Sequence, residues 1–401
     1  MKSMKKMVLV GLVLLASVMV LVGCKMEAEP EVKVPPKLES ISVSPPNKTV
    51  YSVGEGFDTT GMVVTASYDD GTKKTVEGII TPASSEITKT KEVDKCITVS
   101  YTEGGTETEA SFSIDVVDPS VPTKLTNYIS PNNTDDTWTY VAFGEWPQSE
   151  AKNVKENSLK VVDGGRGYFK DNYYKDDNNN CYVKQGDKYY KLEPIVWRVL
   201  NKDYASTGRA LLLAENILTG GREWDDNKNN YMESNIRKWL NGNSGSEEVS
   251  DYNGDAGFLQ TAFTEIAGNF IASITVDNSA QSTSDATGIL AQDTNNACKN
   301  TKDKIFLLSE QEATMLDYGF ANYKASGQGN TRIRVTTDYA EATGASQSST
   351  ENYGGWWWLR SPVSFSEAVA RGIRDNGSAS EGKPVLSSGG GVVPALCIKL
   401  Q

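Results

Sequence analysis

From Leu38 onward, apolar and polar residues alternate in short runs, as they do in half-buried β-strands. Ile41 and Val43 fall on one face of the first run. The sequence YDDGT, with Gly71 able to adopt a positive φ, predicts a hairpin turn, and EGGT predicts another. Short strands separated by such turns are typical of a β-sandwich, so we predict an all-β domain over residues 38–117.

Residues 137–401 combine alternating runs with helical periodicity. TWTYVAFGEWPQ, KYYKLEPIVWRVLNKD and RALLLAENIL predict strands. NNYMESNIRKWLNG predicts a helix that Gly242 ends, and GFLQTAFTEIAG predicts a second helix that ends at Gly268. In DKIFLLSEQEATML, Ser309 and Glu312 are spaced as a capping box between a strand and a helix. This mixture predicts an α+β domain.

The end of the chain, GGGVVPALCIKL, predicts a final strand. Its natural partner is TWTYVAFGEW at the start of the same domain, so we expect the first and last strands to pair antiparallel. Such pairing would make a stiff frame for the polar stretches at 269–302 and 321–353, which predict long loops.

The stretch YGGWWWLRSP places three tryptophans in a row. In a strand, Trp357 and Leu359 share one face, whereas Trp356, Trp358 and Arg360 share the other. Two interpretations stay open. Either all three indoles lie in the core, or Trp356 or Trp358 lines a ligand surface beside Arg360.

The N-terminus has the pattern of a targeting segment. Three lysines precede an apolar run over 7–22, which as a helix would span roughly 24 Å and is short for a bilayer core of ~30 Å. The run ends in LVGC, which resembles the bacterial lipobox. We therefore expect a signal peptide at 1–23, lipidation of Cys24, and a lipid anchor in the bacterial envelope at the outer-membrane surface. The alternatives are a stalled membrane anchor and an ordinary secretory signal.

Two further segments are short and polar. Residues 24–37 are charged and contain proline, which predicts a spacer next to the membrane. Residues 118–136 are rich in Pro, Ser, Asn and Asp, which predicts a linker between the two domains.

Charge and composition exclude several classes of function. The net charge of −12 disfavours a nucleic-acid partner. The chain has no histidine, which excludes Ser-His-Asp and Cys-His catalysis and imidazole metal ligands. Apart from Cys24 there are four cysteines, which could pair in three ways and match no zinc spacing: Cys96, Cys181, Cys298 and Cys397. Cys96 and Cys397 lie in strand-like runs, so we expect buried thiols there.

The N-terminal pattern, from LESISVSPP to FSIDVV, resembles the bacterial immunoglobulin-like domains found in tandem on surface proteins. That resemblance implies a rigid spacer, with a binding role of its own as the alternative. Residues 137–401, through PIVWRVL, ALLLAENIL, GGWWWLRSP and GGGVVPALCIKL, resemble uncharacterised domains of bacterial lipoproteins and, closely, the treponemal variable proteins of diversity-generating retroelements. This second resemblance implies a C-type-lectin-like fold of the formylglycine-generating-enzyme type, in which varied side chains near the C-terminus form a ligand-binding surface.

The residues around and after WLRSP mix aromatic, cationic and small polar side chains without a core period, as adaptable binding surfaces do. The predicted binding residues are Trp356, Trp358, Ser364, Phe365, Ser366, Arg371, Ile373, Arg374, Asp375, Asn376 and Ser378. We expect a monomer that binds an external protein or cell-surface ligand noncovalently and uses no cofactor. The alternatives are a plain solvated loop at these positions, and a purely structural surface protein.

The closest enzymatic alternative is a formylglycine-generating oxidase, a family associated with a reactive cysteine pair. Only Cys298 and Cys397 lie in the later half of this chain, and Cys397 is in an apolar strand, so we predict no enzymatic activity. DYNGDAG begins like a calcium loop, but Ala256 and Ala262 stand where an EF-hand has Gly and Glu. DDNKNN and DDNNN depart from that pattern too and predict turns, so we predict no metal site.

Overall fold

The computed structural model describes residues 34–132, 138–242, 256–350, 352–379 and 381–399 of the 401-residue chain. The predicted signal peptide, the lipidation site Cys24, and most of the calcium-like DYNGDAG stretch lie outside these residues. In the described ranges, no helix is both long enough and apolar enough to cross a bilayer. Strand makes up 36% of the structure and helix 12%, so the protein is mostly β.

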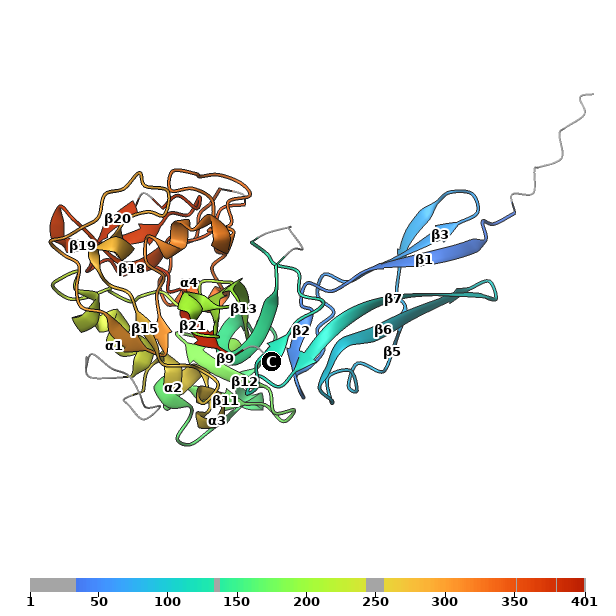
Figure 1. The fold of residues 1–401 in the computed structure, drawn as a ribbon. Helices are drawn as coiled ribbons and strands as arrows, with labels where there is room; N and C mark the ends of the chain where they lie inside the picture. Colours follow the sequence, from blue (N-terminus) through green and yellow to red (C-terminus); the bar gives the residue numbers. More distant parts are fainter. Residues whose placement is uncertain (1–33, 133–137, 243–255, 351, 380, 400–401) are drawn as a thin grey trace, which may run out of the picture.

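The N-terminal domain is the predicted two-sheet sandwich. One sheet has the order β1 (Leu38–Ser44), β3 (Val63–Tyr68), β4 (Lys73–Val76), and the other the order β2 (Val50–Ser52), β7 (Thr106–Val117), β6 (Glu92–Glu103), β5 (Ile79–Thr81). The predicted turn at Gly71 joins β3 to β4, with φ at 80°. Leu38 and Val64 of the first sheet pack against Val99 of the second. In Figure 1 the two sheets extend to one side of the C-terminal domain.

The C-terminal domain is built on a large sheet whose central strand is β13 (Lys188–Asn201). The order of its main path is β10 (Lys160–Val161), β11 (Tyr173–Lys175), β12 (Cys181–Gln185), β13, β14 (Ala210–Ala214), β21 (Ala395–Ile398) and β17 (Ile305–Phe306). β9 (Tyr140–Glu150) also pairs with β13, and β8 (Thr123–Lys124) pairs with β9.

The expected pairing of the first and last strands is wrong. β9 pairs with β13 and β8, whereas β21 pairs with β14 and β17. The physical reason is that β14 is buried along its whole length and therefore needs a hydrogen-bonded neighbour on each edge. β13 occupies one edge and β21 the other, so the first and last strands of the domain share a sheet without being paired.

Smaller elements surround this sheet. A second sheet contains β18 (Trp357–Val363), β19 (Ser366–Ile373) and β20 (Glu381–Pro384), and β15 (Ile274–Val276) pairs with β16 (Thr301–Asp303). The α-helices are α1 (Asn235–Asn241), α2 (Phe258–Ala262), α3 (Glu265–Gly268) and α4 (Asp338–Ala342). The 3-10 turns are η1 (Glu156–Ser158), η2 (Gly167–Phe169), η3 (Tyr204–Ser206), η4 (Tyr231–Glu233), η5 (Ala280–Thr283), η6 (Glu312–Thr314) and η7 (Leu316–Tyr318).

The helix signals were right in kind but overestimated helix length. Gly242 ends α1 in the left-handed conformation, as predicted. The single helix expected over GFLQTAFTEIAG is split, because Phe263 is extended and the Thr264 side chain caps a new helix by accepting from the Ala267 amide. Ser309 and Glu312 form the reciprocal bonds of a capping box, at 3.1 and 2.9 Å, but they begin the 3-10 turn η6.

The described part of the predicted linker is packed between the domains. Both the Thr126 and Asn127 amides donate to Asp115 Oδ2 of β7, at 2.9 Å each. One apolar cluster joins Val50 and Val117 of the sandwich to Tyr140 and Ala142 of β9. Leu125 of the linker belongs to the same cluster. The sandwich is therefore attached through a shared core as well as through the chain.

The four described cysteines are free thiols. Cys397 is buried, as expected, but the prediction of a buried Cys96 is wrong. In β6, Lys95, Ile97 and Val99 are buried on one face of the strand, so Cys96, between Lys95 and Ile97, lies on the opposite, exposed face.

We expect Ellman's reagent to modify Cys96 rapidly in the native protein and Cys397 only after unfolding. Exposure controls access of the reagent, and burial also raises the pKa of the Cys397 thiol, which lowers its thiolate fraction. Stopped-flow absorbance would measure both phases. Cys96→Ser should remove the fast phase; a fast phase of undiminished size in this variant would contradict the assignment.

Candidate functional site

The predicted binding residues lie on and beside the hairpin formed by β18 and β19, with a turn at Ser364 and Phe365. Every residue of β18 is buried, because surrounding loops cover both of its faces. Its backbone is also held from outside the sheet: the Arg360 amide donates to Leu308 O at 2.9 Å, and the Trp224 indole donates to Leu359 O at 2.9 Å. The base of the hairpin is therefore fixed.

The three tryptophans divide between core and surface. Trp357 and Trp358 are fully buried, and their indole N–H groups donate to the carbonyls of Arg332 and Arg222, at 3.1 and 3.3 Å. Trp356 is half-buried, with its ring centroid 4.8 Å from that of Trp358 in an edge-on arrangement. The core interpretation is correct for Trp357 and Trp358, and their hydrogen bonds connect two loops to β18. Of the three tryptophans, only Trp356 is partly exposed.

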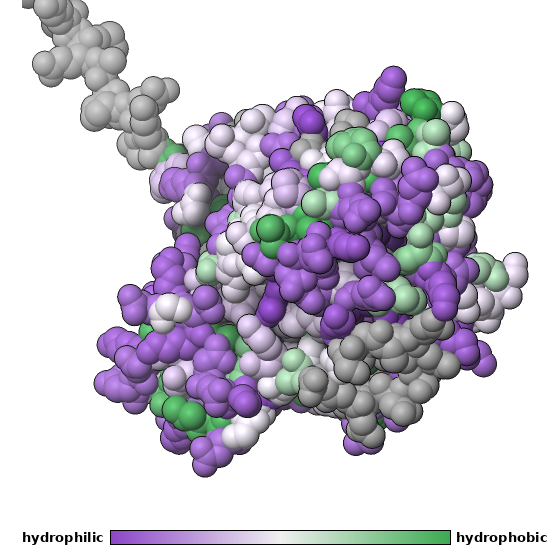
Figure 2. Space-filling view, turned by 90° about the vertical axis from the view of Figure 1, so that its left-hand side faces the viewer, coloured by the Kyte–Doolittle hydropathy of each residue, from purple (hydrophilic) through white to green (hydrophobic). Residues whose placement is uncertain are grey.

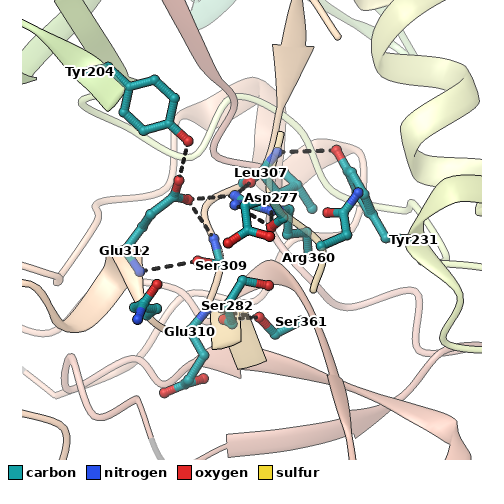
Figure 3. A network of polar contacts seen from close by, with 12 residues as sticks. Tyr204, Tyr231, Asp277, Ser282, Leu307, Ser309, Glu310, Glu312, Arg360 and Ser361 are labelled. Atoms are coloured by element: carbon teal, nitrogen blue, oxygen red, sulfur yellow. Dashed lines mark hydrogen bonds and ion pairs between the residues drawn. The ribbon is translucent and has the colours of Figure 1, made fainter. Parts of the chain in front are cut away.

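Arg360 does not lie on a ligand surface. It is buried in a polar network (Figure 3), where its guanidinium pairs with Glu312 and donates to Leu307 O at 2.6 Å. The hydroxyl of Tyr204 donates to the other oxygen of Glu312 at 2.5 Å. Burial alone would raise the pKa of Glu312, but the charge of Arg360 together with the hydrogen bonds from Arg360, Tyr204 and Ser309 outweighs burial and lowers that pKa. This network is structural, since it leaves no open side for a ligand.

The structure separates the eleven predicted binding residues by burial. Exposed are Ser364, Phe365 and Arg374; half-buried are Trp356, Ser366, Asp375 and Asn376; buried are Trp358, Arg371, Ile373 and Ser378. The prediction that the last four contribute to a ligand surface is therefore wrong. The second half of β19 lies between β18 and β20, and the side chain of Arg371 turns inward.

The accessible residues also do not form one continuous face. Phe365 and Arg374 flank opposite ends of β19, which at about 3.3 Å per residue puts them roughly 30 Å apart along the strand. One group is the hairpin tip, residues 364–368. The other is the turn at 374–376, next to Trp356. Figure 2 looks onto the side of the molecule that carries β18–β20 and shows small hydrophobic areas separated by hydrophilic ones.

Two asparagines that the sequence analysis missed hold the backbone of the hairpin tip. Asn229 Nδ2 donates to the carbonyls of Ser366 and Val369 at 2.8 Å each, and its own amide donates to Glu367 O at 2.7 Å. Asn296 Nδ2 donates to Val363 O at 3.1 Å. The sequence around Asn229, DDNKNN, predicted only a turn, and no local signal shows that its amide reaches a hairpin more than 130 residues away.

These contacts hold the backbone of the tip without using the side chains of Ser364 and Phe365. The side chain of Phe365 is 79% exposed. Because the clamping groups bond main-chain carbonyls, substitutions at 364, 365 or 367 would leave the clamp in place. The tip is therefore a part of the molecule where side chains can change while the backbone stays fixed.

Beneath β19 lies a buried carboxyl group. Both side-chain oxygens of Glu310 are buried without a hydrogen-bond partner, as is Nε of Arg371. Burial raises the pKa of Glu310 to about 8, although the positive charges of Arg371 and Arg332 oppose the shift. Figure 3 shows its carboxyl group turned away from the Glu312–Arg360 network. Glu310 therefore favours the protonated form at neutral pH.

The residues considered for catalysis and metal binding have other roles. Burial raises the pKa of the Cys298 and Cys397 thiols, so neither is activated as a thiolate. In the predicted turns, Asp176 and Asp225 each accept hydrogen bonds from backbone amides that follow them. Within the described ranges, no group of three or more acidic or cysteine side chains is placed to hold a metal ion.

Comparison with known families gives one match in each of the two domains. Residues 44–116 match the bacterial Ig-like domain (group 3), and residues 207–400 match a family described as a domain of unknown function (DUF6273). No curated protein matches the chain. The protein therefore contains a bacterial Ig-like domain, followed by a C-terminal domain whose function is unknown.

Proposed function

We propose that the C-terminal domain binds an external protein or cell-surface ligand noncovalently through the hairpin tip, residues 364–368. The observation that carries this proposal is the combination of a buried, clamped backbone with an exposed aromatic side chain at Phe365. An exposed aromatic anchor on a rigid support binds with little loss of conformational entropy. The Ig-like domain would act as a spacer.

The wider setting is part of the same proposal. A lipid on Cys24 would hold the protein in the bacterial envelope, at the outer-membrane surface, and the chain would act as a monomer without enzymatic activity. A lectin-like fold diversified by a retroelement would agree with the fixed backbone and exchangeable side chains of the tip. The separation of β9 from β21 counts against the lectin-like part of this resemblance.

The test is to screen the full chain against a panel of purified extracellular proteins by biolayer interferometry and to measure variants with each protein that binds. We expect Phe365→Ala to weaken binding at least tenfold, since truncation of a central aromatic anchor costs about 2 kcal/mol or more. The melting temperature should be unchanged, because the side chain is exposed.

Leu386→Ala is the matched control, because this leucine is another exposed apolar residue of the same domain, at 55% exposure. Arg374→Ala tests the turn at the other end of β19. If Arg374→Ala abolishes binding and Phe365→Ala does not, the turn is the binding surface and the proposed site is wrong. If neither variant affects any binding that is detected, binding through the hairpin is wrong altogether.

A further inference from the structure

A cavity of 420 Å³ opens where β9, η2, the end of β12 and α4 meet the loop that follows β14. Its walls combine aromatic rings with amide, hydroxyl and guanidinium groups, and include Trp146, Tyr168, Asn172, Gln185, Arg222 and Tyr339. No residue of the β18–β19 hairpin lines it. The cavity is therefore a separate place from the surface proposed above.

Arg222 is held in this cavity by aromatic rings. Its guanidinium carbon lies 4.7 Å from the ring centroid of Tyr168 and 4.5 Å from that of Trp239. Among the residues that the structure describes, no carboxylate pairs with its side chain and no acceptor takes a hydrogen bond from it. The ring contacts thus position the cation without using its N–H donors. These donors are therefore available to bind an anionic ligand.

A second donor lies near the guanidinium. Burial raises the pKa of Tyr339, and the positive charge of Arg222 acts in the opposite direction. The hydroxyl group therefore stays protonated at neutral pH. In the described part of the chain it has no hydrogen-bond partner, so it can donate to the same ligand as Arg222.

The loop that carries Arg222 is fixed before any ligand binds. The amide of Gly220 donates to Thr343 Oγ1 at 2.9 Å, and the amide of Gly221 donates to Ser388 O at 3.0 Å. Gly221 has a φ of +66°, which a side chain would strain. The cavity therefore has the preformed character of a small-molecule site.

We propose that this cavity binds a small hydroxylated monocarboxylate, such as a sugar acid, with its carboxylate on Arg222 and Tyr339. A single cation with Asp171 also in the wall favours one negative charge over the two of a phosphate. The planar guanidinium matches a carboxylate, and the aromatic rings match an apolar sugar face. The amide of Gln185 and the side-chain oxygen of Asn172, whose Nδ2 donates to Lys184 O, match hydroxyl groups.

The experiment is to titrate D-galacturonate into the full chain and follow tryptophan fluorescence, with D-galactose and inorganic phosphate as comparisons. We expect saturation with a Kd of about 1 mM, and binding at least tenfold weaker for galactose, which lacks the carboxylate, and for phosphate. Arg222→Gln should weaken galacturonate binding at least tenfold and Tyr339→Phe about threefold. Lys170→Gln, an exposed cation outside the cavity, should have no effect.

Several results would overturn the proposal. Equal binding of galactose and galacturonate would exclude recognition of the carboxylate, and tighter binding of phosphate would exclude the monocarboxylate class. Absence of saturation up to about 20 mM galacturonate would exclude the site. If Arg222→Gln lowers the melting temperature, its loss of binding could come from misfolding, and Tyr339→Phe becomes the deciding variant because it removes one oxygen atom only. An unchanged affinity of Tyr339→Phe for galacturonate would then count against the site.

Discussion

Replacing Lys48 by Met is expected to lower the free energy of unfolding by about 3 kcal/mol. Lys48 belongs to the Ig-like domain and pairs with Glu55 of that domain and with Glu193 of β13 in the C-terminal domain. Its side chain is 20% exposed and that of Glu193 is 9% exposed. Methionine keeps the apolar stem but leaves two carboxylates facing each other, little hydrated and without a cation.

The pH dependence of this loss has a definite sign. Burial alone would raise the pKa of Glu193, but the charge of Lys48 together with the hydrogen bonds from Lys48 and Ser149 outweighs burial and lowers that pKa. A carboxyl group whose pKa is lowered by folding stabilises the protein at pH values above its unfolded-state pKa of 4.5. This stabilisation is lost as the pH falls through the folded-state pKa. The penalty of Lys48→Met should therefore be large at pH 7 and much smaller near pH 4.

Urea unfolding followed by circular dichroism would measure the effect. Lys89→Met is the matched control, since Lys89 pairs with Glu86 at the surface, where the side chains are 60% and 51% exposed. That control should change stability by less than about 1 kcal/mol. An equally small effect for Lys48→Met would show that the bridge between the domains does not contribute to stability.

Replacing Glu310 by Gln is expected to stabilise the protein at high pH. The folded-state pKa of Glu310 is raised to about 8 from 4.5, so wild-type stability should fall as pH rises from about 5 through about 8. Glutamine resembles the protonated acid and removes this dependence. At 1.36 kcal/mol per pH unit, the variant should gain up to about 5 kcal/mol at pH 9 and nothing at pH 4. Arg371, Arg332 and Asp285 are the charged groups that act on this carboxyl.

Glu312→Gln is the matched comparison, two residues further along the chain, at the start of η6. Its carboxylate pairs with Arg360 and has a lowered pKa, so this variant should lose about 3 kcal/mol at pH 7 and less at low pH. All eight tryptophans lie in the C-terminal domain, so tryptophan fluorescence during urea unfolding reports the domain that holds both residues. If Glu310→Gln destabilises the protein at every pH, Glu310 forms an ion pair with Arg371 and the assignment of a neutral carboxyl is wrong.

Local patterns along the chain were enough to predict the sandwich, the turns at Gly71 and Gly105, the stop at Gly242 and the capping box at Ser309 and Glu312. Each of these depends on residues close together in sequence: strand alternation, a glycine with positive φ, or a side chain bonded three residues away. The residue types around Phe365 also correctly indicated an exposed side chain at that position.

Contacts between distant segments determined the rest. Alternation says which side chains share a face of a strand, but not whether that face is covered, so the burial of Trp358, Arg371 and Ile373 could not be read from it. Strand order followed from which edge of β14 was free for β21. Asn229 reaches the hairpin tip, and Arg222 lies beside Tyr168 and Trp239, only because the folded chain brings them together. Burial and pairing across the sheet are properties of the whole packed chain, which no short stretch of residues specifies.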